Sequence, residues 1–293
     1  MHLNSNLARI GPSFQVTDSH SGPKRRKINI SRDSVGEDMA ESFWYLKNCN
    51  LFSQVSSEDL AWLESHSRVR RMKRGEPIYM PSQSADGVLL VASGRIKICH
   101  STPEGKQSII DFVDEGEVFG ELALLDAQQR DEYAETTEKT TLILIPKREL
   151  QDMIRKYPAI VLGVTKLIGA RRQKIERRLK NLLFRSNRER VIHLLLELAE
   201  KYGDPQPNGI GLKIRLSHQE MAGIIGSTRE TVTVVLGQLQ SDKLIEIARR
   251  KIVINNLQKL AKEVNESTPR LDCETPAAMP ARGELRASNP PIN

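Results

Sequence analysis

Residues 217–240, with the sequence SHQEMAGIIGSTRETVTVVLGQLQ, decide the fold of this chain. Two short helical patterns flank Gly226, and the second repeats apolar residues at i, i+3, i+4 and i+7 from Val232 to Leu239. The glycine lies where a tight turn favours positive φ, which a residue without Cβ adopts at no steric cost. This pattern predicts a DNA-binding helix-turn-helix, whose second helix enters the major groove. The alternative is an ordinary helical hairpin with a solvated polar face.

The predicted second helix begins with side chains suited to DNA. Ala222 is small enough to let this helix cross the first one closely, and Ser227 or Thr228 is expected to cap it. Its outer face then carries hydroxyl, guanidinium and carboxylate groups, which contact base edges and phosphates. These groups belong to Thr228, Arg229, Glu230, Thr231 and Thr233.

A basic hairpin is expected after the helix-turn-helix. Two apolar runs, 244–247 and 252–254, flank Arg249, Arg250 and Lys251, which indicates a wing with a basic tip. Before the motif, residues 187–202 have the period of an amphipathic helix. A proline-containing loop is expected over 203–211, followed by a short strand at Ile214 and Leu216. The tail from residue 265 is expected to be disordered.

A long helix is predicted between the Pro146 region and the DNA-binding half. Apolar positions recur there with alternating spacings of four and three residues over about three heptads, as in a coiled-coil seam. A parallel homodimer would bury this stripe, whereas the alternative is a helix packed on its own domain. The seam comprises Val161, Thr165, Ile168, Arg172, Ile175, Leu179 and Leu182, so one arginine lies within it.

Residues 69–145 change to a period of two. Short apolar runs at 78–80, 88–91, 96–98, 108–110, 118–119 and 142–145 are separated by glycine-containing turns, which predicts a β-sandwich or β-roll. A helix is expected before it, over 57–66. The polar residues 1–38, with a basic cluster at 24–27, are expected to form a disordered arm, either a solvated tail or a phosphate contact.

Composition narrows the class of protein. The 293 residues suffice for two domains, and 44 Lys+Arg against 37 Asp+Glu leave a net charge of +7. Basic residues dominate 170–190 and acidic residues dominate 111–135, so the C-terminal half favours a polyanionic partner. No apolar run is long enough for a membrane span, and Cys49, Cys99 and Cys273 are too scattered for a disulfide framework. We therefore expect a cytoplasmic protein with no membrane partner.

With the β-rich segment, the long helix and the winged helix-turn-helix in this order, the chain resembles the Crp–Fnr family of bacterial transcription regulators from about residue 43 to about residue 260. The most specific motifs are GEVFGELALL at 116–125 and GSTRETV at 226–232. The resemblance implies an α+β fold with an N-terminal jelly-roll-like β-roll sensor, a long dimerisation helix and a C-terminal winged helix-turn-helix. The expected divisions are 1–38 for the arm, 39–146 for the sensor, 147–185 for the dimerisation helix region, 186–264 for the DNA-binding domain and 265–293 for the tail.

The resemblance also implies what the DNA-binding domain reads. A homodimer would bind double-stranded DNA at inverted repeats of half-sites like TGTGA and would contact RNA polymerase. Arg229 would donate to guanine, Glu230 would accept from cytosine, and Val234 would contact a thymine methyl group. Thr233 completes the expected base-reading set. The expected phosphate contacts are Ser217, His218, Gln219, Ser227, Thr228, Thr231, Arg249, Arg250 and Lys251.

The resemblance places candidate effector residues at Gly120, Glu121, Leu122, Arg130 and Asp131. In cyclic-AMP-binding members a Glu holds the ribose and an Arg-Ser pair holds the phosphate. Here Arg130 is followed by Asp131, whose carboxylate would repel a phosphate by roughly 1 to 4 kcal/mol. Ile175 and Glu176 stand where those members read adenine. We therefore predict no response to cyclic AMP.

The sequence identifies no cofactor and leaves the effector of the sensor open. Three scattered cysteines cannot supply the four ligands of an iron–sulfur cluster. Cys99 and His100 could suggest a haem ligand, but neighbouring strand residues point to opposite faces, so a buried cysteine and an exposed histidine are expected. No P-loop, metal-ligand run or nucleophile elbow is present, which disfavours an enzyme.

Two functions remain open at this stage. The first is a homodimeric, sequence-specific DNA-binding transcription regulator. The second is a ligand-binding regulatory module that docks a protein partner. A steep salt dependence of DNA binding with a retained specificity ratio would distinguish the first from the second.

Overall fold

The computed structural model describes residues 45–46, 49–101, 107–125, 128–248 and 251–271 of the chain. The predicted arm at 1–38, the turn expected at 103–105, the wing residues Arg249 and Arg250, and the tail from 272 lie outside the described residues.

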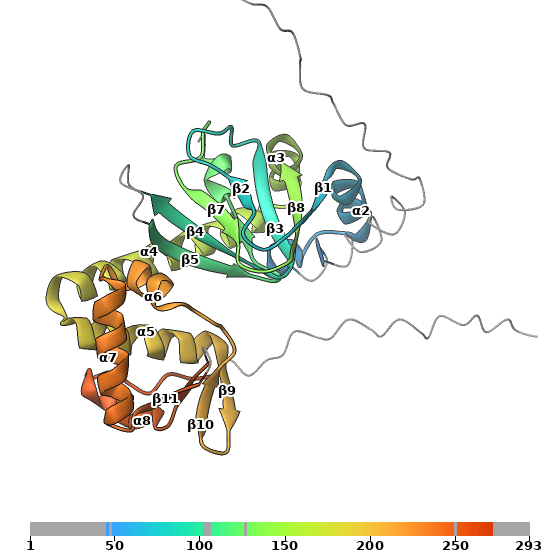
Figure 1. Cartoon of the computed structure of the whole chain (residues 1–293). Helices are drawn as coiled ribbons and strands as arrows, with labels where there is room; N and C mark the ends of the chain where they lie inside the picture. The colour runs from blue at the N-terminus through green and yellow to red at the C-terminus, as the bar shows by residue number, and fades with distance from the viewer. Residues whose placement is uncertain (1–44, 47–48, 102–106, 126–127, 249–250, 272–293) are drawn as a thin grey trace, which may run out of the picture.

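The N-terminal half is a β-roll of two facing sheets (Figure 1). One four-stranded antiparallel sheet has the order β1 (Arg68–Met72), β8 (Thr140–Pro146), β3 (Gly87–Ser93) and β6 (Val118–Phe119). The other has the order β2 (Pro77–Tyr79), β7 (Tyr133–Thr136), β4 (Arg95–Ser101) and β5 (Gln107–Asp114). Side chains from both sheets interdigitate in one buried cluster that includes Leu89, Ile96 and Phe119, as alternating strands require.

The sequence pattern did not predict β1 and β7. In β1, RVRRM, only Met72 is buried, because this strand lies at the edge of its sheet. In β7, the residues that face inward are Ala134 and Thr136, which carry little apolar bulk. Both strands form through their antiparallel pairing with longer neighbours, β8 for β1 and β4 for β7.

Helices cover the outer face of the first sheet. Helix α2 (Ser57–His66), the short 3-10 helix η1 (Asn50–Phe52) and α3 (Lys147–Lys156) share a buried cluster with β3 and β8. The first half of α4 (Ala159–Phe184) also packs there through Ile160 and Val164. Gly163 permits this approach, because a Cβ at that position would lie 2.7 Å from Leu51.

The C-terminal half is a winged helix-turn-helix. It contains α5 (Asn187–Tyr202), α6 (His218–Ile225), α7 (Arg229–Ser241) and α8 (Leu257–Glu263). Its sheet has the order β11 (Ile245–Ala248), β12 (Lys251–Ile254), β10 (Gly209–Leu212) and β9 (Gly203–Gln206). The β11–β12 hairpin confirms the predicted wing.

Two local predictions in this half are wrong. Residues 203–211 were expected to be a loop but contain the β9–β10 hairpin. Pro205 does not prevent this pairing, because it lies in edge strand β9, where a proline is tolerated. The strand expected at Ile214 and Leu216 is instead irregular chain within the described range. Ile214 is nevertheless buried, since it packs into the core of the DNA-binding half.

The two halves contact each other directly, because α6 rests on β5 (Figure 1). Ser108 Oγ in β5 donates a hydrogen bond to the carbonyl oxygen of Gly223 in α6 (3.3 Å). Because neighbouring residues of a strand point to opposite faces, Ile98 enters the core of the β-roll while Cys99 joins the core of the DNA-binding half. Cys99 is thus buried and His100 exposed, as predicted.

Candidate nucleic-acid interface and sensor pocket

Local capping determines where the two helices of the helix-turn-helix begin and end. Ser217 caps α6 in a reciprocal capping box with Glu220, and Thr228 caps α7 by accepting from the amide of Thr231. Gly226 ends α6 with φ 63°, in the left-handed region predicted for the turn. Ala222 is fully buried between the helices.

The residues predicted to read bases lie together on one exposed face of α7. Arg229, Glu230, Thr233 and Val234 are all exposed, and the Val234 side chain is 60% exposed despite being apolar. The Thr233 hydroxyl donates to the carbonyl oxygen of Arg229 (2.8 Å). Because its single proton is used there, this hydroxyl can only accept a hydrogen bond from a base.

The described residues predicted to contact phosphates differ in exposure, and His218 is half-buried with Nδ1 2.8 Å from Oγ1 of Thr233. Gln219 and Lys251 are exposed, whereas four hydroxyl side chains are engaged inside the motif. Ser217 donates to Glu220 (2.8 Å), Ser227 donates to Asn187 (3.1 Å), and Thr228 and Thr231 share a hydrogen bond of 3.0 Å. These hydroxyls therefore shape the turn, and their contact with phosphate stays a prediction.

The candidate effector residues lie around the short 3-10 helix η2 (Glu121–Leu124), which contacts α4 through the pairing of Glu121 with Arg171. Gly120 precedes η2 with φ 72°, and a Cβ there would lie 2.5 Å from the guanidinium of Arg130. Glu121 and Arg130 are buried, while the other candidates, Leu122 and Asp131, are exposed.

Arg130 is bound by the chain itself. Its guanidinium donates to the carbonyl oxygen of Gly120 (2.9 Å) and to that of Gly87, and it lies 4.7 Å from the ring centroid of Tyr79. The group that the resemblance implies for an effector phosphate is therefore engaged with backbone and with an aromatic face.

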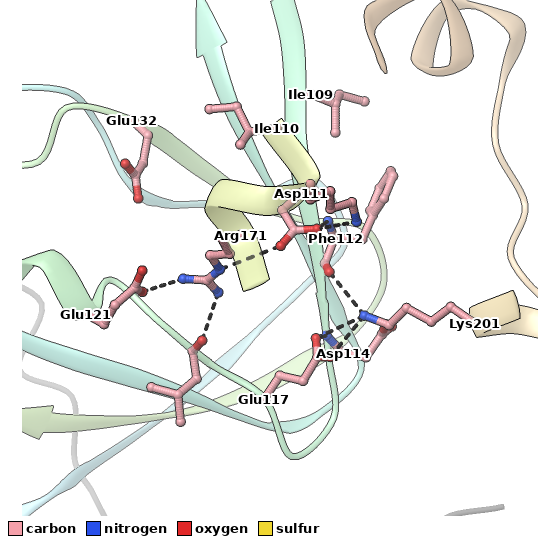
Figure 2. Close-up of polar contacts among 12 residues, drawn as sticks. Ile109, Ile110, Asp111, Phe112, Asp114, Glu117, Glu121, Glu132, Arg171 and Lys201 are labelled. Atoms are coloured by element: carbon pink, nitrogen blue, oxygen red, sulfur yellow. Dashed lines mark hydrogen bonds and ion pairs between the residues drawn. The ribbon is translucent and has the colours of Figure 1, made fainter. Parts of the chain in front are cut away.

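Glu121 is also bound by the chain, through Arg171 of α4 (Figure 2). The same guanidinium donates to the carbonyl oxygen of Val118 (2.9 Å) and lies 3.6 Å from Asp111. Glu132 faces this cluster, and burial together with the negative charge of Glu121 raises the pKa of Glu132. An anionic ligand would therefore meet carboxylates, and Arg171 beside them is already paired with Glu121.

Sequence reasoning missed Arg171, Asp111 and Glu132. Arg171 lies one turn before Ile175 on α4, which was a usable signal, because residues four apart share a helix face. Asp111 and Glu132 carried no such signal, since only the fold brings β5 and the segment before β7 to the same pocket.

A band of ion pairs joins the sensor to the DNA-binding half (Figure 2). Lys201 at the end of α5 binds Asp114 (2.8 Å) and Glu117 (3.0 Å), and Lys174 of α4 bridges Asp111 and Glu197 (both 2.8 Å).

Burial raises the pKa of Cys99 to about 11, so this thiol at the same interface is protonated at neutral pH.

Comparisons with known proteins match this arrangement. Residues 69–157 match the cyclic nucleotide-binding domain family, and residues 189–263 match the Crp-like helix-turn-helix domain family. The global nitrogen regulator of Synechococcus elongatus is 30% identical over 198 residues, which cover 67% of this chain and 89% of that protein. The chain belongs to the Crp–Fnr family of transcription regulators.

Other members of the Crp–Fnr family show the same architecture. The cyclic AMP receptor protein of Thermus thermophilus is 27% identical over 202 residues, covering 69% of this chain and 90% of that protein. The structure of a CooA mutant from Carboxydothermus hydrogenoformans superposes with a TM-score of 0.61 at 25% identity, covering 68% of this chain and 88% of that one. The β-roll, the long helix and the helix-turn-helix are thus those of a DNA-binding transcription regulator. Among the helices that the structure describes, none combines the length and apolarity of a bilayer span.

Proposed function

We propose that this Crp–Fnr protein is a homodimer that binds inverted-repeat promoter sites, acts on RNA polymerase in the cytoplasm, and works by binding rather than by catalysis. The observation that carries the proposal is the exposure of the seam on α4. Ile175, Leu179 and Leu182 are 50%, 53% and 48% exposed in the single chain. Half-exposed apolar side chains in one stripe on a charged helix indicate a surface that a second copy covers.

The rest of the seam supports the same assembly. Val161 is exposed at the start of α4, whereas Ile168 packs partly on the sensor of its own chain. Arg172 pairs with Glu176 on the same helix (2.8 Å) and is exposed, so it can lie at the edge of a paired helix. A polar residue at one seam position favours a single register of a parallel coiled coil.

The sensor of this regulator is proposed not to respond to cyclic AMP. Arg130 is engaged by two backbone carbonyls and Glu121 by Arg171, so neither side chain is free for a phosphate or a ribose. Ile175 cannot hydrogen-bond an adenine. Displacing Arg171 would also leave Glu121, Glu132 and Asp111 without their shared cation beside an anionic ligand.

Signals from the sensor are proposed to reach DNA by two routes. The first is the dimerisation helix α4, as the family resemblance implies. The second is the packing of α6 on β5, supported by the hydrogen bond from Ser108 to Gly223 and by the ion pairs of Lys201. Movement of β5 would therefore move the helix-turn-helix without passing through α4.

Light scattering and DNA binding test the dimer together. The double variant Ile175→Asp with Leu179→Asp is expected to be monomeric and to lose high-affinity binding, because two half-sites one helical turn apart need two linked domains. Each buried Ile or Leu contributes roughly 1.5 to 3 kcal/mol per chain. The matched control is Gln173→Asp, which adds the same charge to an exposed position outside the seam and should remain dimeric. A wild type that is monomeric at micromolar concentration and binds the full site tightly would contradict the proposal.

A further inference from the structure

A chain of hydrogen bonds joins the two helices of the helix-turn-helix on its exposed face. Nδ1 of His218, the first residue of α6, lies 2.8 Å from Oγ1 of Thr233 in α7. The same Oγ1 lies 2.8 Å from the carbonyl oxygen of Arg229, one turn earlier in α7. His218 therefore borders the face that carries the exposed Arg229 side chain.

The directions of these two hydrogen bonds determine the tautomer of His218. The carbonyl oxygen of Arg229 can only accept, so Thr233 donates its single hydroxyl proton to it. Oγ1 of Thr233 is then the acceptor toward His218, and Nδ1 must carry a proton. In the neutral ring the other nitrogen, Nε2, consequently has a lone pair and no proton. Among the residues that the structure describes, none is hydrogen-bonded to this Nε2.

A phosphate oxygen only accepts hydrogen bonds, so it repels the Nε2 lone pair of a neutral ring held in this tautomer. The ring can bind phosphate through Nε2 only after it gains a second proton, and opposite charges then strengthen the bond. We propose that His218 binds a DNA backbone phosphate as the imidazolium, so that each DNA-binding domain takes up one proton when it binds DNA. The proposal rests on the proposed function, because it takes the exposed face of α7 as the face toward DNA.

The other ionisable side chains around His218 have different partners or positions. On α6, Glu220 is held in the capping box. On α7, Arg229 and Glu230 are exposed in the first turn. Of the elements packed on α6, α5 contributes Arg190, which donates to carbonyl oxygens at the C-terminal end of α6, and β5 makes its contact there through uncharged groups.

Fluorescence anisotropy with a duplex of two inverted TGTGA half-sites tests the proposal at constant ionic strength. For the wild-type dimer on this duplex we expect Kd to decrease by about a hundredfold from about pH 8 to about pH 6, because each of its two domains gains a hydrogen bond to a charged group that is worth about tenfold. Calorimetry in buffers of different ionisation enthalpy should report uptake of about one proton per DNA-binding domain. A scrambled duplex should give the same proton uptake, because phosphate contacts do not depend on sequence.

Three variants separate the tautomer argument from a general effect of pH. His218→Arg has a permanent charge, so its Kd should be independent of pH and its proton uptake absent. Thr233→Val removes the acceptor that holds the ring, so the neutral ring can place its proton on Nε2 and the pH dependence should shrink. The matched control is His66→Gln, a histidine replacement in sensor helix α2, which should keep the wild-type pH dependence.

Each result bears on the proposal. His218→Arg with the proton uptake of the wild type would overturn it, and so would a wild type whose Kd does not change with pH. Nitrogen NMR of the free protein should find the proton of the neutral His218 ring on Nδ1, and a proton on Nε2 would overturn the tautomer argument without any DNA. Loss of DNA binding by the wild type at every pH would instead contradict the proposed function, so the two failures are distinguishable.

Discussion

Replacing Gly223 by alanine tests the contact between the sensor and the helix-turn-helix. If the contact is present, the substitution should lower the stability of the protein, whereas without it the substitution should raise the stability. Gly223 lies within α6, and a Cβ at this position would lie 2.9 Å from the carbonyl oxygen of Gln107 in β5. This oxygen belongs to the backbone, so either α6 or β5 must shift to accommodate the added Cβ. Overpacking of this kind costs about 1 to 3 kcal/mol. In a helix without that neighbour, the same substitution stabilises by about 0.5 to 1 kcal/mol, because alanine is the better helix former.

The two contributions predict a net loss of up to about 2.5 kcal/mol for Gly223→Ala, and therefore a decrease of the melting temperature by up to several degrees in calorimetry. The matched control is Gly237→Ala in α7, where nothing lies within 4 Å of the added Cβ and the melting temperature should rise. An increase for Gly223→Ala equal to that of Gly237→Ala would refute the packing of α6 on β5 in solution. Proteolysis of the folded protein supplies a second readout, since a released DNA-binding half should be cleaved faster near residues 185–186.

Three further predictions concern DNA, the sensor and pH. Arg229→Ala should cost about 1 to 3 kcal/mol of binding free energy on the preferred site and flatten the preference at one base pair in a selection from random DNA. Lys251→Ala should weaken binding to all sequences alike and reduce the slope of log K against log salt concentration by about one. An unchanged motif for Arg229→Ala would show that Arg229 does not read a base. Calorimetry with cyclic AMP should show no binding at physiological concentrations, and a tight saturable isotherm would contradict the proposed sensor. Burial and the charge of Glu121 raise the pKa of Glu132, so the folded state holds this proton more tightly and stability is lost as pH rises from about 4. Glu132→Gln should therefore raise the melting temperature at pH 7 and have no effect near pH 4, and an equal effect at both would refute the electrostatic cause.

Local features of the sequence were sufficient for several helices of this protein, although they predicted neither α8 nor the break between α3 and α4. The spacing of Val232, Val235, Leu236 and Leu239 predicted α7, and Gly226 adopts the predicted positive φ. Residues 187–202 are the predicted amphipathic helix, and the stripe predicted on α4 is exposed over its second half. These features depend on residues three to seven apart, and helix periodicity and capping act over the same distance. The roles of individual residues at DNA stay predictions.

Pairing between segments far apart in the sequence decided the strands and contacts that the sequence did not predict. Strands β1 and β7 form because their partners are in place, although their own residues carry little apolar bulk. The ion pair between α4 and η2 joins Arg171 to Glu121, 50 residues earlier, and the hydrogen bond between the two halves joins Ser108 to Gly223 across 115 residues. Such contacts leave no period in the sequence, because each requires two elements to be folded and packed before their side chains meet. The sequence by itself therefore determined that the chain has a sensor domain, a long helix and a DNA-binding motif. Only the tertiary structure decided that Arg130 and Glu121 are bound by other groups of the same chain, and that the motif rests on the sensor domain.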